Sequence, residues 1–163
     1  MISVKNGFEV SGRDLDVISR RLLKDDFLLK LLYYTSSAPW NEPDLSPTQK
    51  EEAYESCIRL VPKMVFEEFK RSFVVITFDK FRPSDNIAYR TNHIIVDVIC
   101  PLEIWRLSDK MLRPYKIMQR IEESLTGTSL NGIGRVEFLG ADSVFLGEEL
   151  AGFTMTFKTV KNV

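Results

Sequence analysis

The sequence predicts an α+β protein: a four-stranded, mainly antiparallel sheet with one helix packed on its apolar face. Residues 73–78 are β-branched and aromatic, residues 89–100 and 153–158 alternate in polarity, and residues 114–125 repeat apolar side chains at helical spacing. Alternation of this kind is typical of antiparallel strands with one covered and one solvated face. The order predicts a ββαββ core in residues 61–163, and residues 1–60 add N-terminal helices to the same domain.

The N-terminal part is predicted to hold an arm and two helices. Residues 1–12 are expected to form a short strand or an arm. Asp14 is a suitable N-cap for one helix that reaches about Tyr34, because apolar residues recur there every three or four positions. After a polar loop, the segment from Ser46 to Gln49 predicts a capping-box start for a short helix that ends near Cys57.

The hairpin, the helix and the glycine-rich corner of the core are each predicted from local sequence patterns. Residues 73–81 and 89–100 are expected to pair as a long hairpin, with a polar turn at 82–86. Pro114 suits the first turn of the helix that follows. Gly127 is expected to end that helix in a left-handed conformation, and Gly132 and Gly134 to turn the chain back onto the sheet.

Composition narrows the class of protein. The chain has 163 residues, enough for one domain with a sizeable core, and a formal charge of -1 from 22 Lys and Arg against 23 Asp and Glu. This balance argues against avid, non-specific binding of nucleic acid, which needs a basic surface. The N-terminus lacks the order of a signal peptide, and no apolar run approaches the ~20 residues that span a bilayer. We therefore expect a soluble protein made in the cytoplasm.

The residues offer little chemistry. Cys57 and Cys100 are far apart in the sequence and are expected to be reduced thiols, with a disulfide as the less favoured alternative. His93 is the only histidine, which excludes a His-pair metal site. Asp97 lies four residues along the same predicted strand, ~13 Å away at ~3.3 Å per residue, which is too far for a hydrogen bond that would orient His93 as a catalytic base. We expect no catalytic residue, no cofactor and no metal.

Two weaker chemical alternatives remain open. The best acid and lysine set for a metal-dependent nuclease is Asp79 and Lys80 with Asp97 and Glu103, in an order that matches no established motif. The basic residues of the hairpin turn are interleaved with aromatic ones, which would allow stacking on nucleic acid, although an ordinary polar hairpin tip explains them better. The glycine-rich residues 127–134 follow a helix instead of opening one, so they are not a phosphate-binding loop.

Residues 70–160 resemble the tail-terminator, or tail-completion, proteins of tailed bacteriophages. The resemblance lies in the order and spacing of a strand, a helix, a "GIG" corner and a final strand that begins with glycine and an aromatic residue. Its segments are residues 94–101, Trp105, residues 112–121, residues 125–127, residues 131–138 and residues 151–157. Residues 1–60 depart from the short forms of the family.

The resemblance implies a structural protein of the virion neck. Such proteins cap the tail tube as a ring, usually a homo-hexamer, end tail polymerisation, and contact the head–tail connector and, in contractile tails, the sheath. Genomic DNA passes through the ring without specific binding, and no catalysis is implied. Alternatives are another neck or head-completion component, and, as a different class, a small accessory enzyme or ligand-binding α+β domain.

Exposed aromatic and basic residues at the edges of elements are the expected contacts of the ring or tube. The candidate interface residues are Phe81, Arg82, Tyr89, Arg90, Trp105 and Arg135. The structural turn residues are Gly127, Gly132 and Gly134.

Overall fold

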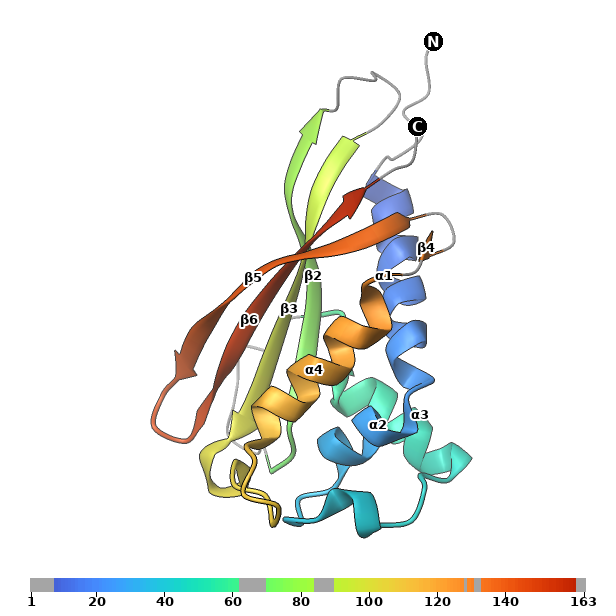
Figure 1. Ribbon diagram of the computed structural model, residues 1–163. Coiled ribbons are helices and arrows are strands. Elements are labelled where there is room, and N and C mark those ends of the chain that lie inside the picture. The colour runs from blue at the N-terminus through green and yellow to red at the C-terminus, as the bar shows by residue number, and fades with distance from the viewer. Residues whose placement is uncertain (1–7, 62–69, 84–89, 128, 131–132, 161–163) are drawn as a thin grey trace.

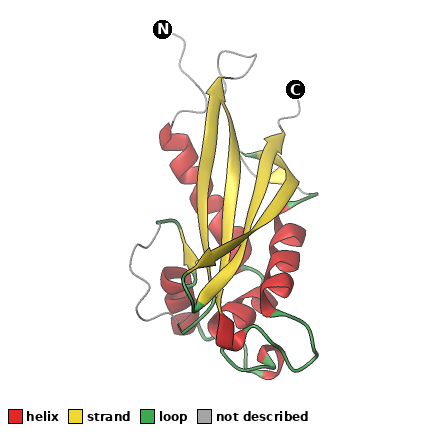
Figure 2. Cartoon of the chain, turned by 90° about the vertical axis from the view of Figure 1, so that its left-hand side faces the viewer, coloured by secondary structure: helices red, strands yellow, loops and turns green. Residues whose placement is uncertain are grey.

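The computed structural model describes residues 8–61, 70–83, 90–127, 129–130 and 133–160. A long, twisted sheet carries α1 and α4 along its length, and α2 and α3 gather near one end (Figures 1 and 2). The helices are α1 (Phe8–Leu23), α2 (Asp26–Tyr33), α3 (Pro47–Ser56) and α4 (Arg113–Leu125), with short 3-10 helices η1 (Pro39–Asn41) and η2 (Leu102–Ile104). The strands are β1 (Ile58–Arg59), β2 (Phe73–Pro83), β3 (Arg90–Pro101), β4 (Ser129–Leu130), β5 (Gly134–Leu146) and β6 (Leu150–Val160).

The predicted α+β class is confirmed, but the four-stranded sheet was incomplete. Within the described residues the sheet has six strands in the order β1-β2-β3-β6-β5-β4. The long strands β2, β3, β6 and β5 are antiparallel to their neighbours, as expected, and β1 adds a parallel pair at the edge of β2. The sequence missed β1 and β4 because two residues are too few to show alternation.

The N-terminal helix differs from its prediction in both start and length. Residues 8–12, expected as strand or arm, already belong to α1, so Asp14 lies inside the helix and is not its N-cap. The helix also breaks before Tyr34, because Asp25 adopts an extended conformation and its side chain accepts a hydrogen bond from the Leu28 backbone N–H. This N-cap starts α2 as a separate helix. Residues 1–7 lie outside the described residues.

The capping predictions for α3 and the end of α4 are confirmed. The Ser46 hydroxyl accepts from the Gln49 backbone N–H at 3.2 Å, and the Gln49 side chain accepts from the Ser46 backbone N–H at 2.9 Å. Gly127 has φ 79° after α4, and Gly134 has φ 94° at the start of β5, both in the region that favours glycine. Gly132 lies outside the described residues.

One hydrophobic core joins the helices to the sheet. Ile94, Val96 and Val98 face it together from β3, as their alternation predicted, and all three are fully buried. The N-terminal helices contribute Ile18 and Leu22, among others, to this same core. Residues 1–60 therefore supply part of the core into which the sheet packs.

The face of the sheet that points away from this core is not uniformly solvated, contrary to expectation. Phe73, Val75, Ile99 and Leu150 form a second buried cluster on that face, at the end of the sheet where β2 starts. The guanidinium of Arg59 lies 4.7 Å from the centre of the Phe73 ring and covers part of it. Val144 and Leu146, near the end of β5, pack against this cluster. The sheet is strongly twisted (Figure 2).

A buried arginine joins the start of α4 to the N-terminal helices. Arg113 is 0 % exposed and donates to the backbone carbonyls of Ile104, Leu31, Tyr34 and Ser36. Two of these carbonyls belong to the C-terminal end of α2, where a cation is favoured by the helix dipole. Burial lowers the pKa of Arg113, and the four carbonyl contacts offset the cost of desolvating its charge.

Candidate interaction surface

The predicted interface residues near the hairpin turn are only partly visible. Phe81 is half-buried and packs edge-on against Phe8 and Phe78, with ring centres 5.2 and 6.3 Å apart. Arg82 is exposed beside it, at the end of β2. Tyr89 and the side chain of Arg90 lie outside the described residues. This end of the sheet therefore combines an aromatic cluster with an exposed base.

Trp105 lies at the opposite end of β3 and has a structural role. Its indole N–H donates to the carbonyl of Cys100 at 3.0 Å, and its ring centre lies 6.5 Å from that of Phe153. A half-buried tryptophan held in this way orders the segment between β3 and α4. The structure does not bring it together with Phe81 and Arg82, because the length of β3 separates them.

Arg135 is exposed near the start of β5, at the same end of the sheet as Arg82 but toward the other edge. Its guanidinium lies 3.5 Å from Glu137, whose second oxygen lies 3.4 Å from the ammonium of Lys158. These exposed contacts stabilise the surface weakly. The predicted interface residues that the structure describes therefore form no single patch.

Sequence reasoning missed several exposed apolar side chains on β5 and at the start of α4. Phe145 is 75 % exposed near the end of β5, and Leu139 and Phe138 are exposed ~20 Å away on the same strand, at ~3.3 Å per residue. Met111 and Tyr115 are exposed at the start of α4, where the Tyr115 ring packs 5.1 Å from Phe153 of β6. The second half of β5, residues 139–146, was not predicted as a strand because its residues do not alternate in polarity.

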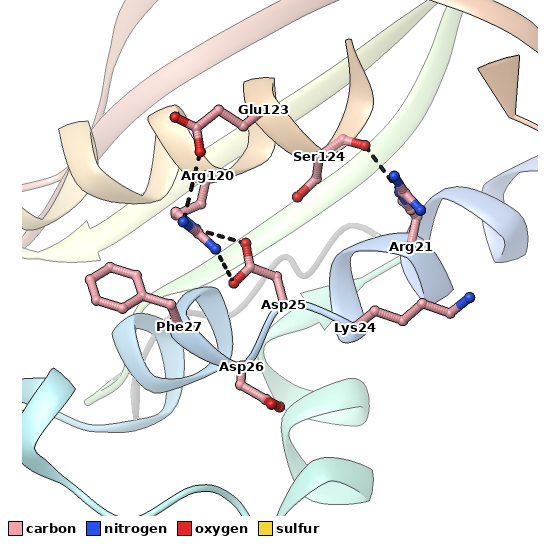
Figure 3. A pocket seen from close by; sticks show the side chains of 8 residues that line it. All are labelled: Arg21, Lys24, Asp25, Asp26, Phe27, Arg120, Glu123 and Ser124. Atoms are coloured by element: carbon pink, nitrogen blue, oxygen red, sulfur yellow. Dashed lines mark hydrogen bonds and ion pairs between the residues drawn. The ribbon is translucent and has the colours of Figure 1, made fainter. Parts of the chain in front are cut away.

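A polar groove lies where the α1–α2 corner meets α4 (Figure 3). It has a volume of about 530 Å³ and is lined by Arg21, Lys24, Asp25, Asp26, Phe27, Arg120, Glu123 and Ser124. The Asp25 carboxylate accepts two hydrogen bonds from Arg120, at 2.7 and 2.8 Å, and is only 10 % exposed.

The charged side chains Arg120, Asp25 and Arg21 of this groove hold the helices together. The contact with Asp25 raises the pKa of Arg120, whose guanidinium also lies 5.2 Å from the centre of the Phe27 ring. Arg21 donates to the backbone carbonyl of Ser124 at 3.2 Å and adds a second link to α4. Figure 3 shows Arg120 and Asp25 pointing toward each other, with Lys24 directed away from them. These contacts link the α1–α2 corner to α4, and the charges of Asp25 and Arg120 neutralise each other.

The acids of the nuclease alternative do not converge. Asp97 accepts a hydrogen bond from the Thr154 hydroxyl at 2.6 Å, whereas Asp79 accepts one from the backbone N–H of Lys80 at 2.7 Å. Asp79 is paired in register with His93, and Glu103 lies in η2 beyond the far end of β3. Among the residues that the structure describes, no group of three or more His, Cys, Asp or Glu could hold a metal ion.

The two cysteines are free and buried, in agreement with the expectation of reduced thiols. Burial raises the pKa of Cys57 and raises that of Cys100 to about 12. Since the thiolate is the nucleophilic and metal-binding form, neither side chain is poised for such chemistry near neutral pH. In the part of the chain described by the structure, no helix is long and apolar enough to cross a membrane.

Comparison with known proteins places the chain in a family. A search of curated proteins found no match. The sequence profile of the YomW family, in contrast, matches residues 25–159, from the α1–α2 corner to the last strand. This match covers most of the chain and includes α2, α3, the sheet and α4, and it identifies the protein as a member of YomW, a phage-type protein family.

Proposed function

We propose that this protein is a structural subunit of the phage neck that caps the tail tube as a ring. The observation that carries the proposal is the resemblance of residues 70–160 to tail terminators, in the order of β3, α4, the glycine corner, β5 and β6. Membership of a phage-type family supports the same setting. The ring would end tail polymerisation and join the tail to the head connector, with DNA passing through it.

The exposed surface is compatible with protein contacts on several sides. A homo-hexameric ring needs two different patches on each subunit, one for each neighbour. Exposed apolar side chains lie on β5 and at the start of α4. The subunit would also need surfaces that contact the tube protein, the connector and, in a contractile tail, the sheath. A net charge of -1 suits a channel wall, because a basic wall would retain the passing DNA through its phosphates.

Tail length is the decisive test of capping. We expect a phage that lacks this gene to produce overlong tails in electron micrographs, and a plasmid copy to restore their normal length. Tails of normal length detached from full heads would instead support the head-completion alternative. Normal, infectious particles would contradict both neck functions.

The composition of purified particles tests the structural class. We expect mass spectrometry to find the protein in virions at about six copies per tail, in proportion to other neck proteins. Antibody labelling should place it at the junction of head and tail. Its absence from particles would favour an accessory enzyme or a ligand-binding domain.

A further inference from the structure

The β5 edge of the sheet is open for most of its length. Within the described residues, β4 pairs only with Gly134 and Arg135, so β5 has no partner on this side from Val136 to Leu146. Phe138, Leu139 and Phe145 on this strand are 39 %, 46 % and 75 % exposed. A long edge strand with exposed apolar side chains is a template for a further strand.

The β2 edge is open as well. In the described part of the chain, β1 pairs only with Val74 and Val75, so β2 lacks a strand on this side from Ile76 to Pro83. The open part of β2 lies toward its end, near the hairpin turn. The open part of β5 lies toward the β5–β6 turn, at the opposite end of the sheet.

The two open edges carry opposite charge. On β5 and β6 no basic residue occurs between Val136 and Phe157, whereas Asp142, Glu148 and Glu149 are exposed near the β5–β6 turn. The open part of β2 carries the exposed bases Lys80 and Arg82 with one acid, Asp79. The acidic part of one edge therefore complements the basic part of the other, while each edge repels a copy of itself.

The strand directions allow the two edges to join. Each of the pairs β2–β3, β3–β6 and β6–β5 is antiparallel, so β5 runs opposite to β2. When copies are repeated around an axis with their strands equally tilted, β5 of one copy meets β2 of the next in antiparallel orientation. The alternation of strand direction then continues without interruption from copy to copy.

The offset between the charged parts also fits a closed ring. Asp142 lies in the same row across the sheet as Thr154, Asp97 and Val75. Lys80 lies in the bulge of β2, between Asp79 and Arg82, whose β3 partners are four and six residues from Asp97, the partner of Val75. It is therefore ~13–20 Å beyond Val75 at ~3.3 Å per residue, with ~17 Å as the middle value. If Asp142 lies beside Lys80 of the next copy, each copy is shifted by this distance along the strand direction relative to its neighbour. Across the strands, one copy is four strands wide, or ~19 Å at ~4.8 Å per strand. The resulting strand tilt of about 40° lies within the ~35–45° of closed barrels.

We propose that neighbouring copies join edge to edge, with β5 of one subunit pairing antiparallel with β2 of the next and Asp142 facing Lys80. The inference rests on the ring of the proposed function and names the surface that closes it. With Asp142 opposite Lys80, the open part of β2 would reach β5 from Leu146 to about Leu139, so pairing would close the β2 edge and leave only Val136–Phe138 of the β5 edge uncovered. It makes the interface heterologous, so that the chain assembles by rotation into a ring.

Charge reversal tests this pairing. We expect Asp142→Lys with Glu148→Lys, and separately Lys80→Glu with Arg82→Glu, to weaken self-association at least tenfold, because like charges then face each other. An equimolar mixture of the two variants should assemble again, since each reversed edge complements the other variant. Mass photometry measures assembly in solution, and mass spectrometry measures incorporation into particles.

Matched controls carry equal charge changes away from both edges. Glu51→Lys with Glu55→Lys on α3, and Arg13→Glu with Lys24→Glu around α1, should assemble like the wild type. If the wild type forms rings and the edge variants do so equally well, edge pairing is wrong while the ring proposal stands. If the wild type forms no ring and is missing from particles, the proposed function itself fails.

Discussion

At the scale of single residues, Gly152 is a position that leaves no room for a side chain. A Cβ added there would overlap the backbone carbonyl of Val98 on the neighbouring strand β3, and backbone atoms cannot turn aside as a side chain can. The resemblance to tail terminators drew attention to this glycine, but only the sheet shows what it touches.

We expect Gly152→Ala to lower the free energy of unfolding by more than about 3 kcal/mol, because β3 and β6 must separate to accept it. Urea denaturation followed by circular dichroism measures the change. Gly140→Ala is the matched control, since a Cβ at Gly140 meets no atom within 4 Å and should change stability by less than about 1 kcal/mol. Equal effects of the two substitutions would contradict this explanation.

Cys100 predicts a dependence of stability on alkaline pH. Burial raises its pKa to about 12 in the folded protein, from an ordinary value of 9.0. Between these two values the unfolded chain releases the thiol proton and the folded chain keeps it, so unfolding is favoured as pH rises. The contribution of Cys100 to stability is complete below about pH 9 and falls by about 1.4 kcal/mol per pH unit above it.

The measurement is urea denaturation of the wild type and of Cys100→Ala at a series of pH values between about 8 and 11. The difference between their free energies of unfolding should shrink as pH rises through this range. Taking the difference removes the contribution of the other titrating groups. Two curves that remain parallel would show that the Cys100 thiol ionises in the folded state as it does in the unfolded chain.

Arg113 shows the limit of prediction at this scale. Arginine is among the residues least often buried, so nothing in the sequence marked this one as fully enclosed. Its acceptors come from Ile104 and from the end of α2 about 80 residues earlier, and they meet only in the folded chain. A local pattern contains no information about such distant acceptors.

At the scale of elements, the break between α1 and α2 depends on Asp25. The apolar periodicity continues through both helices and predicted one helix, but the Asp25 side chain caps α2 and binds Arg120 of α4 at the same time. A cap and a bidentate ion pair together favour the corner over a continued helix. The periodicity was a correct guide to the buried face and a poor guide to the boundary.

We expect Asp25→Ala to lower the free energy of unfolding by about 2 kcal/mol, the sum of a lost cap and a lost, largely buried ion pair. Asp25→Asn keeps a capping oxygen and should cost less. A double-mutant cycle with Arg120→Ala, read by urea denaturation, isolates the ion pair as a coupling energy of about 1 kcal/mol. A coupling energy near zero would mean that Asp25 acts through the cap alone.

The length of β5 shows a second limit at the scale of elements. The sequence alternates only over residues 135–138, where Val136 and Phe138 are apolar and Arg135 and Glu137 are charged, although the strand continues to Leu146. The register shifts between Phe138 and Gly140, so that the residues after the shift change faces relative to those before it. Such a bulge interrupts the period of two by which a strand is recognised in a sequence. The exposed apolar residues of this strand were missed for that reason.

At the scale of the whole molecule, the N-terminal helices and the sheet share one core. Ile18, Leu22, Leu28 and Leu32 are fully buried in the cluster that contains the sheet residues Val96 and Phe157. Arg113 strengthens this union through its contacts with the end of α2. The resemblance to shorter tail terminators began at residue 70, but the core of this protein extends into the preceding residues.

We expect residues 61–163 expressed alone to lack a cooperative unfolding transition, because the core loses its N-terminal side and Arg113 loses most of its acceptors. Circular dichroism during heating measures this. The matched control is co-expression with residues 1–60 as a separate chain, which should restore cooperative unfolding by supplying the missing contacts. A stable, cooperatively unfolding fragment 61–163 would contradict a shared core.

The sequence by itself determined the α+β class, the β2–β3 hairpin, α3 with its capping box, α4 with its glycine end, and the polarity of the final strand. Each of these depends on neighbours within a few positions, where periodicity and capping act. Only the tertiary structure decided the break at Asp25, the burial of Arg113, the full length of β5 and the two open sheet edges. These depend on backbone and side chains brought together from distant parts of the chain, so no local pattern specifies them.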